Sequence, residues 1–247
     1  MEIFGLTHKG MVRKNNEDSF VYFEQGLNKL PNLAIVADGM GGHQAGEVAS
    51  RFAIDFFMEY VENYDGDVSS YFEFMRDALC IANDKVYEKS IFNPEFFGMG
   101  TTFIACTVAD GLVHIAHVGD SRLYEINEDS IKLLTVDHTY ANEMVRAGVL
   151  SEEEGMNHPK RHALTKAIGI GRGVEADGYS LAYGEGSILL MCSDGLTEMI
   201  REAEILEIVN SSNKLCEVAE ALISRANDYG GVDNITVILA RVGGESL

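Results

Sequence analysis

Residues 101–118, TTFIACTVADGLVHIAHV, consist of two largely apolar stretches on either side of an Asp-Gly pair. The stretches 101–108 and 112–118 have the character of β-strands. Asp110-Gly111 between them is typical of a tight hairpin turn, because both residue types tolerate the positive φ angles that such a turn requires. This segment therefore predicts two strands that pair in an antiparallel manner.

Other strands surround this hairpin along the chain. Residues 123–126 and 131–135 predict a second hairpin directly after it. Further strands are predicted at 19–23, 33–37, 179–183, 187–192 and 235–242, and Glu185-Gly186 joins 179–183 to 187–192.

Four helices are predicted, in two pairs. Residues 47–64 and 70–90 repeat apolar side chains at spacings of three and four, which is typical of amphipathic helices. Gly66 interrupts the pattern, so we expect these two helices to be antiparallel neighbours. The second pair is predicted at 202–209 and 214–229.

Hairpin-linked strands and paired helices indicate an α+β fold rather than a doubly wound parallel sheet. About ten short strands are too many for one sheet, so we predict two stacked antiparallel sheets with helices outside. No boundary or linker is evident, and 1–247 is expected to be a single domain. Residues 137–166 are polar, with a helical patch at 140–146.

The charge excludes some classes of partner. Lys and Arg number 19 and Asp and Glu 39, which gives a formal charge of −20. Duplex nucleic acid and anionic membrane surfaces both require a cationic protein surface, so we expect neither as a partner. The acidic excess is either a solvated surface or, in part, a set of metal ligands.

Location follows from the cysteines and from the beginning of the sequence. Cys80, Cys106, Cys192 and Cys216 form no C-x-x-C motif and have apolar neighbours, as expected of free thiols in a reducing compartment. Residues 1–7 lack the features of a secretory signal, and no apolar run approaches the ~18 residues of a membrane span. We therefore expect a cytoplasmic protein.

Aspartates recur where predicted strands begin or end. Asp38, Asp120 and Asp194 follow apolar strands, and Asp233 precedes one. Aspartate before glycine is also a common turn signal, which fully explains Asp110. That explanation is weaker at Asp38, Asp194 and Asp233. After Asp38 and Asp194 the chain continues into a glycine-rich loop or a helix.

If the stacked sheets align these strand ends, several carboxylates meet at one edge. Their mutual repulsion is costly unless cations lie between them. Carboxylate oxygens favour Mg²⁺ or Mn²⁺, and no His/Cys cluster has the spacing of a zinc site. The pattern therefore indicates a Mg²⁺ or Mn²⁺ site.

Five motifs, in order, resemble those of the metal-dependent Ser/Thr protein phosphatases of the PP2C-like (PPM) family, in its bacterial form. They are RKNNEDS at 13–19, ADGMGGH at 37–43, VGDSR at 118–122, SDG at 193–195 and VDN at 232–234. The resemblance spans about 4–242. It implies a sandwich of two antiparallel sheets flanked by pairs of antiparallel helices, in agreement with the pattern above.

The resemblance also implies metal ligands. Asp38 corresponds to a carboxylate that bridges two metal ions, and Asp194 and Asp233 would complete the first metal site. Glu17 and the backbone carbonyl of Gly39 would serve the second, largely through water.

Further roles follow from the same resemblance. Asp18 lies next to these ligands and would orient them, and Arg13 would clamp the substrate phosphate. Asp120, with Asp194, corresponds to a pair that holds a third, weaker metal ion in bacterial members. Residues 137–166 fall where those members carry a flap over the site.

This set of residues suits hydrolysis without a phosphoenzyme. Two cations about 4 Å apart share one water, lower its pKa and present hydroxide to the phosphorus. They also offset the charge of the phosphoryl oxygens. Arginine suits bidentate phosphate binding better than lysine does.

One position departs from the family pattern. Many eukaryotic members have a histidine directly after the Asp-Gly, proposed as the general acid, and here that residue is Met40. His43 or a metal-bound water are the alternatives, and a local structural role for His43 is equally compatible with the sequence. The acid therefore remains unassigned.

The sequence thus predicts a Mn²⁺- or Mg²⁺-dependent phosphatase that acts on phosphoserine and phosphothreonine in proteins and opposes a bacterial Ser/Thr kinase. It is expected to be monomeric. Two alternatives are a phosphatase dedicated to one small regulator and a catalytically inactive phosphoprotein-binding domain. Retention of Arg13 and the four aspartates argues against the inactive domain.

Overall fold

The computed structural model describes residues 1–41 and 45–243. Within these residues the strands are β1 (Glu2–His8), β2 (Asp18–Phe23), β3 (Leu33–Met40), β4 (Gly100–Thr101), β5 (Phe103–Ala109), β6 (Leu112–Val118), β7 (Arg122–Ile126), β8 (Ile131–Leu133), β9 (Asp177–Ala182), β10 (Ile188–Cys192) and β11 (Ile235–Arg241). The helices are α1 (Ala45–Asn63), α2 (Tyr71–Phe92), α3 (Tyr140–Arg146), α4 (Glu152–Met156), α5 (Asp194–Thr197), α6 (Glu202–Val209) and α7 (Leu215–Asp228), and a short 3-10 helix spans Pro94–Phe96.

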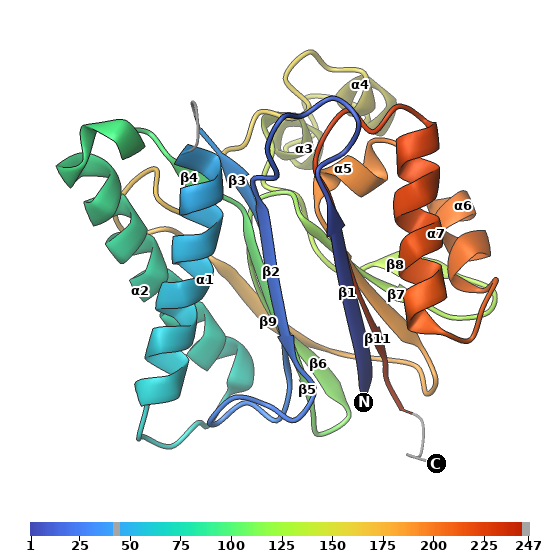
Figure 1. The fold of residues 1–247 in the computed structure, drawn as a ribbon, viewed down its shortest axis with the longest axis horizontal. Helices are drawn as coiled ribbons and strands as arrows, with labels where there is room; N and C mark the ends of the chain where they lie inside the picture. Colours follow the sequence, from blue (N-terminus) through green and yellow to red (C-terminus); the bar gives the residue numbers. More distant parts are fainter. Residues whose placement is uncertain (42–44, 244–247) are drawn as a thin grey trace.

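The strands form two antiparallel sheets. One has the order β1-β11-β10-β7-β8, and the other has the order β2-β3-β5-β6-β9 with β4 beside β3. Figure 1 shows the two sheets side by side, with α1 and α2 outside one and α6 and α7 outside the other. The predicted α+β sandwich with flanking helix pairs is therefore confirmed.

Three hydrophobic clusters hold the four layers together. Strand β5 shows how, because its side chains alternate between the two faces of the sheet. Phe103 and Ala105 pack in the cluster beneath α1 and α2, whereas Ile104 and Cys106 pack between the sheets. A third cluster, which includes Leu222 of α7, joins the other sheet to its helices. The sandwich is thus buried on both faces of each sheet.

The hairpin predicted at 101–118 is present. Strands β5 and β6 pair from Phe103 opposite Val118 to Ala109 opposite Leu112. Asp110 and Gly111 have φ angles of 53° and 75°, as a type I′ turn requires. This Asp-Gly pair is therefore a turn, as expected.

Strand β1 and the connection between β9 and β10 differ from the sequence prediction. Strand β1 was not predicted, although it pairs along its whole length with β11. Glu185-Gly186 does join β9 to β10, but these strands lie in different sheets, since β9 pairs with β6 and β10 pairs with β7 and β11. The turn therefore carries the chain from one sheet to the other.

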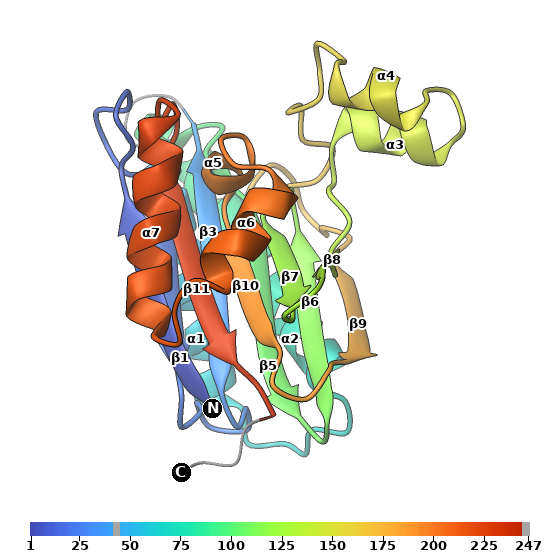
Figure 2. The same ribbon diagram turned by 90° about the vertical axis from the view of Figure 1, so that its right-hand side faces the viewer.

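Residues 137–166 contain α3 and α4. Helix α3 covers the predicted helical patch, and α4, which was not predicted, begins with a capping box formed by Ser151 and Glu154. Figure 2 shows that both helices stand beyond the ends of the sheets. The two ends of the segment come together through a bridge between Thr139 and Leu164. Among the described residues, none of the helices combines the length and apolar character needed to cross a membrane.

Candidate active site

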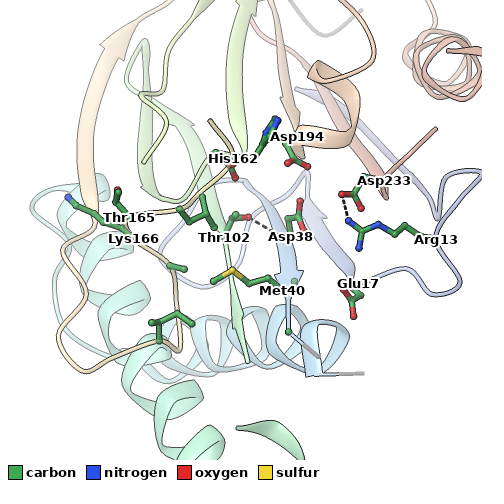
Figure 3. A pocket seen from close by; sticks show the side chains of 16 residues that line it. Arg13, Glu17, Asp38, Met40, Thr102, His162, Thr165, Lys166, Asp194 and Asp233 are labelled. Atoms are coloured by element: carbon green, nitrogen blue, oxygen red, sulfur yellow. Dashed lines mark hydrogen bonds and ion pairs between the residues drawn. The ribbon is translucent and has the colours of Figure 1, made fainter. Parts of the chain in front are cut away.

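One pocket of about 510 Å³ lies where the two sheets end together. Asp38 belongs to β3 of one sheet, while Asp194 follows β10 and Asp233 precedes β11 of the other. Figure 3 shows these three carboxylates around a common space. The seven residues proposed from the sequence as metal or phosphate ligands all line it: Arg13, Glu17, Asp38, Gly39, Asp120, Asp194 and Asp233.

The backbone around Asp38 is fixed by two threonines. The Asp38 N–H donates to Thr102 Oγ1 at 2.9 Å, and the Asp38 carbonyl accepts from Thr102 N at 2.9 Å and from Thr101 Oγ1 at 2.8 Å. At Gly39 a Cβ would lie 2.1 Å from the Gly46 carbonyl oxygen, so no other residue fits there. The site is therefore attached to a rigid strand end.

Burial and mutual repulsion disfavour the ionised form of these carboxylates when no cation is bound. Burial, followed by repulsion from Asp18, Asp194, Asp120 and Asp233, raises the pKa of Asp38 well above its usual range. Burial and then Asp194 likewise raise the pKa of Asp120, and burial raises the pKa of Asp194 to about 6. Positive charge would relieve this repulsion.

The residues present fit divalent cations. Asp194 Oδ1 is a buried oxygen with no hydrogen-bond partner. The donors that face the pocket from Asp38, Asp194, Asp233 and Glu17 are all carboxylate oxygens, which are the ligands preferred by Mg²⁺ and Mn²⁺. A buried oxygen without a partner and a group of carboxylates that repel one another are both features of a divalent cation site.

Asp18 lies behind the pocket rather than in its lining. It is opposite Asp38 in the β2–β3 register, and its Oδ2 accepts hydrogen bonds from Ser193 Oγ at 2.8 Å and Thr236 Oγ1 at 2.6 Å. Burial raises its pKa to about 7. Asp18 thus ties β2 to the two strand ends of the other sheet that carry Asp194 and Asp233.

Arg13 reaches the pocket from the loop between β1 and β2. Its guanidinium Nη2 lies 2.5 Å from Asp233 Oδ2, and about half of the Arg13 side chain is exposed (Figure 3). Asn234 holds this loop, since its side chain donates to the Lys9 and Asn15 carbonyls and accepts from Glu17 N. Asn234 belongs to the VDN motif at 232–234, which by itself gives no signal for this role.

Asp120 follows β6 and is 8 % exposed. The neighbouring Arg122 makes a bidentate ion pair with Asp137, with distances of 3.0 Å from Nε to Oδ1 and 2.7 Å from Nη2 to Oδ2. This pair fastens the start of the segment 137–166 to β7, close to Asp120.

The pocket also contains residues that the sequence analysis did not single out. His162, Thr165 and Lys166 enter it from the segment 137–166. His162 Nδ1 lies 2.7 Å from Glu198 Oε1, and His162, Asp194 and Glu198 offer ligand atoms that all lie within 4.8 Å of one another. A loop histidine in a polar segment gives no periodic or motif signal, so only the fold identifies it. Met40 lines the pocket, whereas His43 lies outside the described residues.

Comparison with known proteins identifies the family. The family model for protein phosphatase 2C matches residues 11–239. A serine/threonine phosphatase, stp, of Listeria innocua is 39% identical over 235 residues, which covers 94% of this chain and 92% of the relative.

Solved structures give the same result. The structure of the S. agalactiae serine/threonine phosphatase has a TM-score of 0.89 and 38% identity, covering 96% of this chain and 98% of the other. The catalytic domain of the phosphatase PstP, solved in complex with two manganese ions, has a TM-score of 0.83 and 31% identity, with 97% of each chain covered. The fold is thus that of serine/threonine phosphatases. The chain belongs to the protein phosphatase 2C (PPM) family, in its bacterial form.

Proposed function

We propose that this phosphatase hydrolyses phosphoserine and phosphothreonine in proteins, with two Mn²⁺ or Mg²⁺ ions in the pocket and a third bound more weakly. The observation that carries the proposal is the convergence of carboxylates from both sheets beside a single arginine. The relatives named as serine/threonine phosphatases and the manganese-bound PstP domain support it.

In this proposal Asp38, Asp194, Asp233, Glu17 and the Gly39 carbonyl hold the two ions, and Asp120 with Asp194 holds the third. Bound divalent cations supply Lewis-acid activation of water and neutralise the charge of the phosphoryl group. Asp38 is suited to a bridging position because the Asp18, Asp194, Asp120 and Asp233 carboxylates all surround it.

The other residues act by binding and orientation. Arg13, exposed at the rim, donates two parallel hydrogen bonds to the substrate phosphate, and Asp233 keeps its guanidinium at the pocket. Asp18 orients the strand ends through Ser193 and Thr236. Residues 137–166 contact the protein part of the substrate as a flap within the single domain 1–247.

The partners follow from the same chemistry. The substrates are phosphoproteins, among them the targets of a cognate Ser/Thr kinase. The enzyme acts as a monomer in the cytoplasm. All four cysteines are free thiols, which supports a reducing compartment.

Hydrolysis of a phosphothreonine peptide tests the function. We expect turnover with Mn²⁺ or Mg²⁺, none with EDTA, and loss of nearly all activity in Asp38→Asn. Asp110→Asn is the matched control, because the same change there affects only a hairpin turn whose φ angle of 53° asparagine tolerates. Full activity in EDTA, or an active Asp38→Asn protein, would contradict the proposal.

A further inference from the structure

His138 lies at the start of the segment 137–166 and is joined to Gly119 by two hydrogen bonds. The Gly119 N–H donates to His138 Nδ1 at 3.0 Å, and the His138 N–H donates to the Gly119 carbonyl at 2.8 Å. Only 5% of the His138 side chain is exposed. Gly119 directly precedes Asp120, so this pairing fixes the backbone that presents Asp120 to the pocket.

The direction of the side-chain bond determines the protonation state of His138. An amide N–H can only donate, so Nδ1 must be unprotonated and the ring proton must be on Nε2. Nε2 lies 3.3 Å from Asp177 Oδ2, but it is not aligned for a regular hydrogen bond. The well-formed contact of the ring is therefore the one to Gly119.

The surroundings of the ring favour its neutral form. The His117 ring stacks on it with centroids 4.9 Å apart and an interplanar angle of 21°. Burial lowers the pKa of both histidines. A neutral ring leaves Nδ1 free to accept, which agrees with the hydrogen bond to Gly119.

The turn at Gly119 requires such support. Its φ angle is 109°, and a Cβ there would lie 2.6 Å from Thr102 Cβ. A glycine in this conformation has wide backbone freedom when nothing holds it. The His138 bond restricts that freedom at the residue next to Asp120.

We propose that His138 is a positioning residue for the phosphatase reaction: its Nδ1 acceptor holds the Gly119 amide and thereby sets the orientation of Asp120. The proposal deepens the proposed function, since it rests on Asp120 being a metal ligand. His138 itself does not line the pocket and touches no substrate.

Two substitutions separate the ring nitrogens. In His138→Asn the amide oxygen can take the place of Nδ1, whereas in His138→Gln the amide reaches the place of Nε2 and leaves the Gly119 N–H without a partner. We expect His138→Asn to keep kcat within about threefold of wild type and His138→Gln to lose about tenfold or more, with KM nearly unchanged in both. Thermal unfolding of both variants, with activity corrected for the folded fraction, removes the effect of stability.

A double-mutant cycle tests whether His138 acts through Asp120. When Asp120→Ala is already present, His138→Gln should cost little further activity, because the residue that it positions is gone. Equal kcat values for His138→Asn and His138→Gln, or fully additive losses with Asp120→Ala, would overturn the proposal.

A spectroscopic measurement is independent of activity. In ¹⁵N-histidine-labelled protein, long-range ¹H–¹⁵N spectra should show His138 as the neutral Nε2–H tautomer at about pH 7.5. A proton on Nδ1 would overturn the proposal even in a fully active enzyme. If the enzyme shows no metal-dependent activity while the Nε2–H tautomer is present, the proposed function fails but the His138–Gly119 bond does not.

Discussion

Arg13 combines an ion pair in the pocket with exposure to solvent. Its guanidinium is paired with Asp233, and it is about half exposed at the entrance, where a phosphate arrives. An arginine in this position binds a phosphate through its planar fork, which a lysine ammonium cannot reproduce.

Arg13→Ala should therefore raise KM for phosphopeptides about tenfold, with a smaller effect on kcat. The KM of Arg13→Lys should lie between those of the wild type and Arg13→Ala. The affinity for Mn²⁺ should not fall, because Arg13 supplies no metal ligand. Steady-state kinetics and Mn²⁺ titration measure both effects. An unchanged KM would remove Arg13 from phosphate binding.

His117 is a buried histidine that the reaction does not use. Burial, and then the neighbouring His138, lower its pKa to about 3. Between about pH 6.5 and pH 3 the unfolded chain binds a proton at this residue that the folded chain does not. The free energy of unfolding therefore falls as the pH falls through this range.

Between about pH 7 and pH 5 this loss is on the order of 2 kcal/mol. His117→Phe should remove this pH-dependent loss of stability. The difference in unfolding free energy between wild type and variant should therefore change by about 2 kcal/mol between pH 7 and pH 5. Urea denaturation in EDTA at both pH values measures the change, and the aspartates contribute equally to both proteins. A difference that stays constant with pH would show that His117 does not titrate as described.

At the scale of elements, the strands and helices with strong local signals could be predicted. The Asp110-Gly111 hairpin and helices α1, α2 and α7 carry their own turn or periodicity. Strand β1 could not, because Gly5 interrupts its apolar pattern and its pairing with β11 joins opposite ends of the chain. The pairing of the strands beside Glu185-Gly186 could not be predicted either. An Xaa-Gly turn can connect two paired strands of a hairpin or two strands in different sheets, and the local sequence does not distinguish them.

The carboxylates of the pocket were predictable for a related reason. Each of Asp38, Asp120, Asp194 and Asp233 adjoins a predicted strand, and stacked sheets can align such strand ends at one edge. The role expected of each residue came from the resemblance to the phosphatase family. His162 and Lys166 could not be found in this way. They come from the segment 137–166, where only the bridge between Thr139 and Leu164 and nearby contacts determine which side chains enter the pocket.

The segment 137–166 should exchange its amide hydrogens faster than β5 and β6. Only Ala141 of α3 and Gly155 of α4 are buried, so little apolar surface holds these helices in place. Exchange monitored by mass spectrometry should show rapid labelling at 140–163 and protection at His138. Protection of the whole segment equal to that of the sheets would contradict this prediction.

Substrate preference should also depend on this segment. Val149 and Met156 are 65% and 73% exposed there. Changing both to serine should raise KM for a phosphoprotein severalfold and leave hydrolysis of a small aryl phosphate unchanged, because the small substrate does not reach them. Ile81→Ser on α2 is the control, and equal effects on both substrates would argue against a role in recognition.

At the scale of the whole molecule, the fold brings together charges that repel one another. The two sheets are joined by an apolar layer, yet their ends place Asp38 among four further carboxylates. In a chain with a net charge of −20, this cluster is stable only to the extent that protons or cations neutralise it. In the proposed function, divalent cations do so and thereby supply the catalytic centre.

Calorimetric titration of Mn²⁺ into the metal-free protein tests this claim most directly, with Asp38→Asn compared against the turn control Asp110→Asn. The account predicts at least two Mn²⁺ ions bound per chain in wild type and in Asp110→Asn. In Asp38→Asn it predicts loss of tight binding by a factor of about ten or more, because both ions lose a charged ligand. An isotherm for Asp38→Asn that matches the wild type would contradict it.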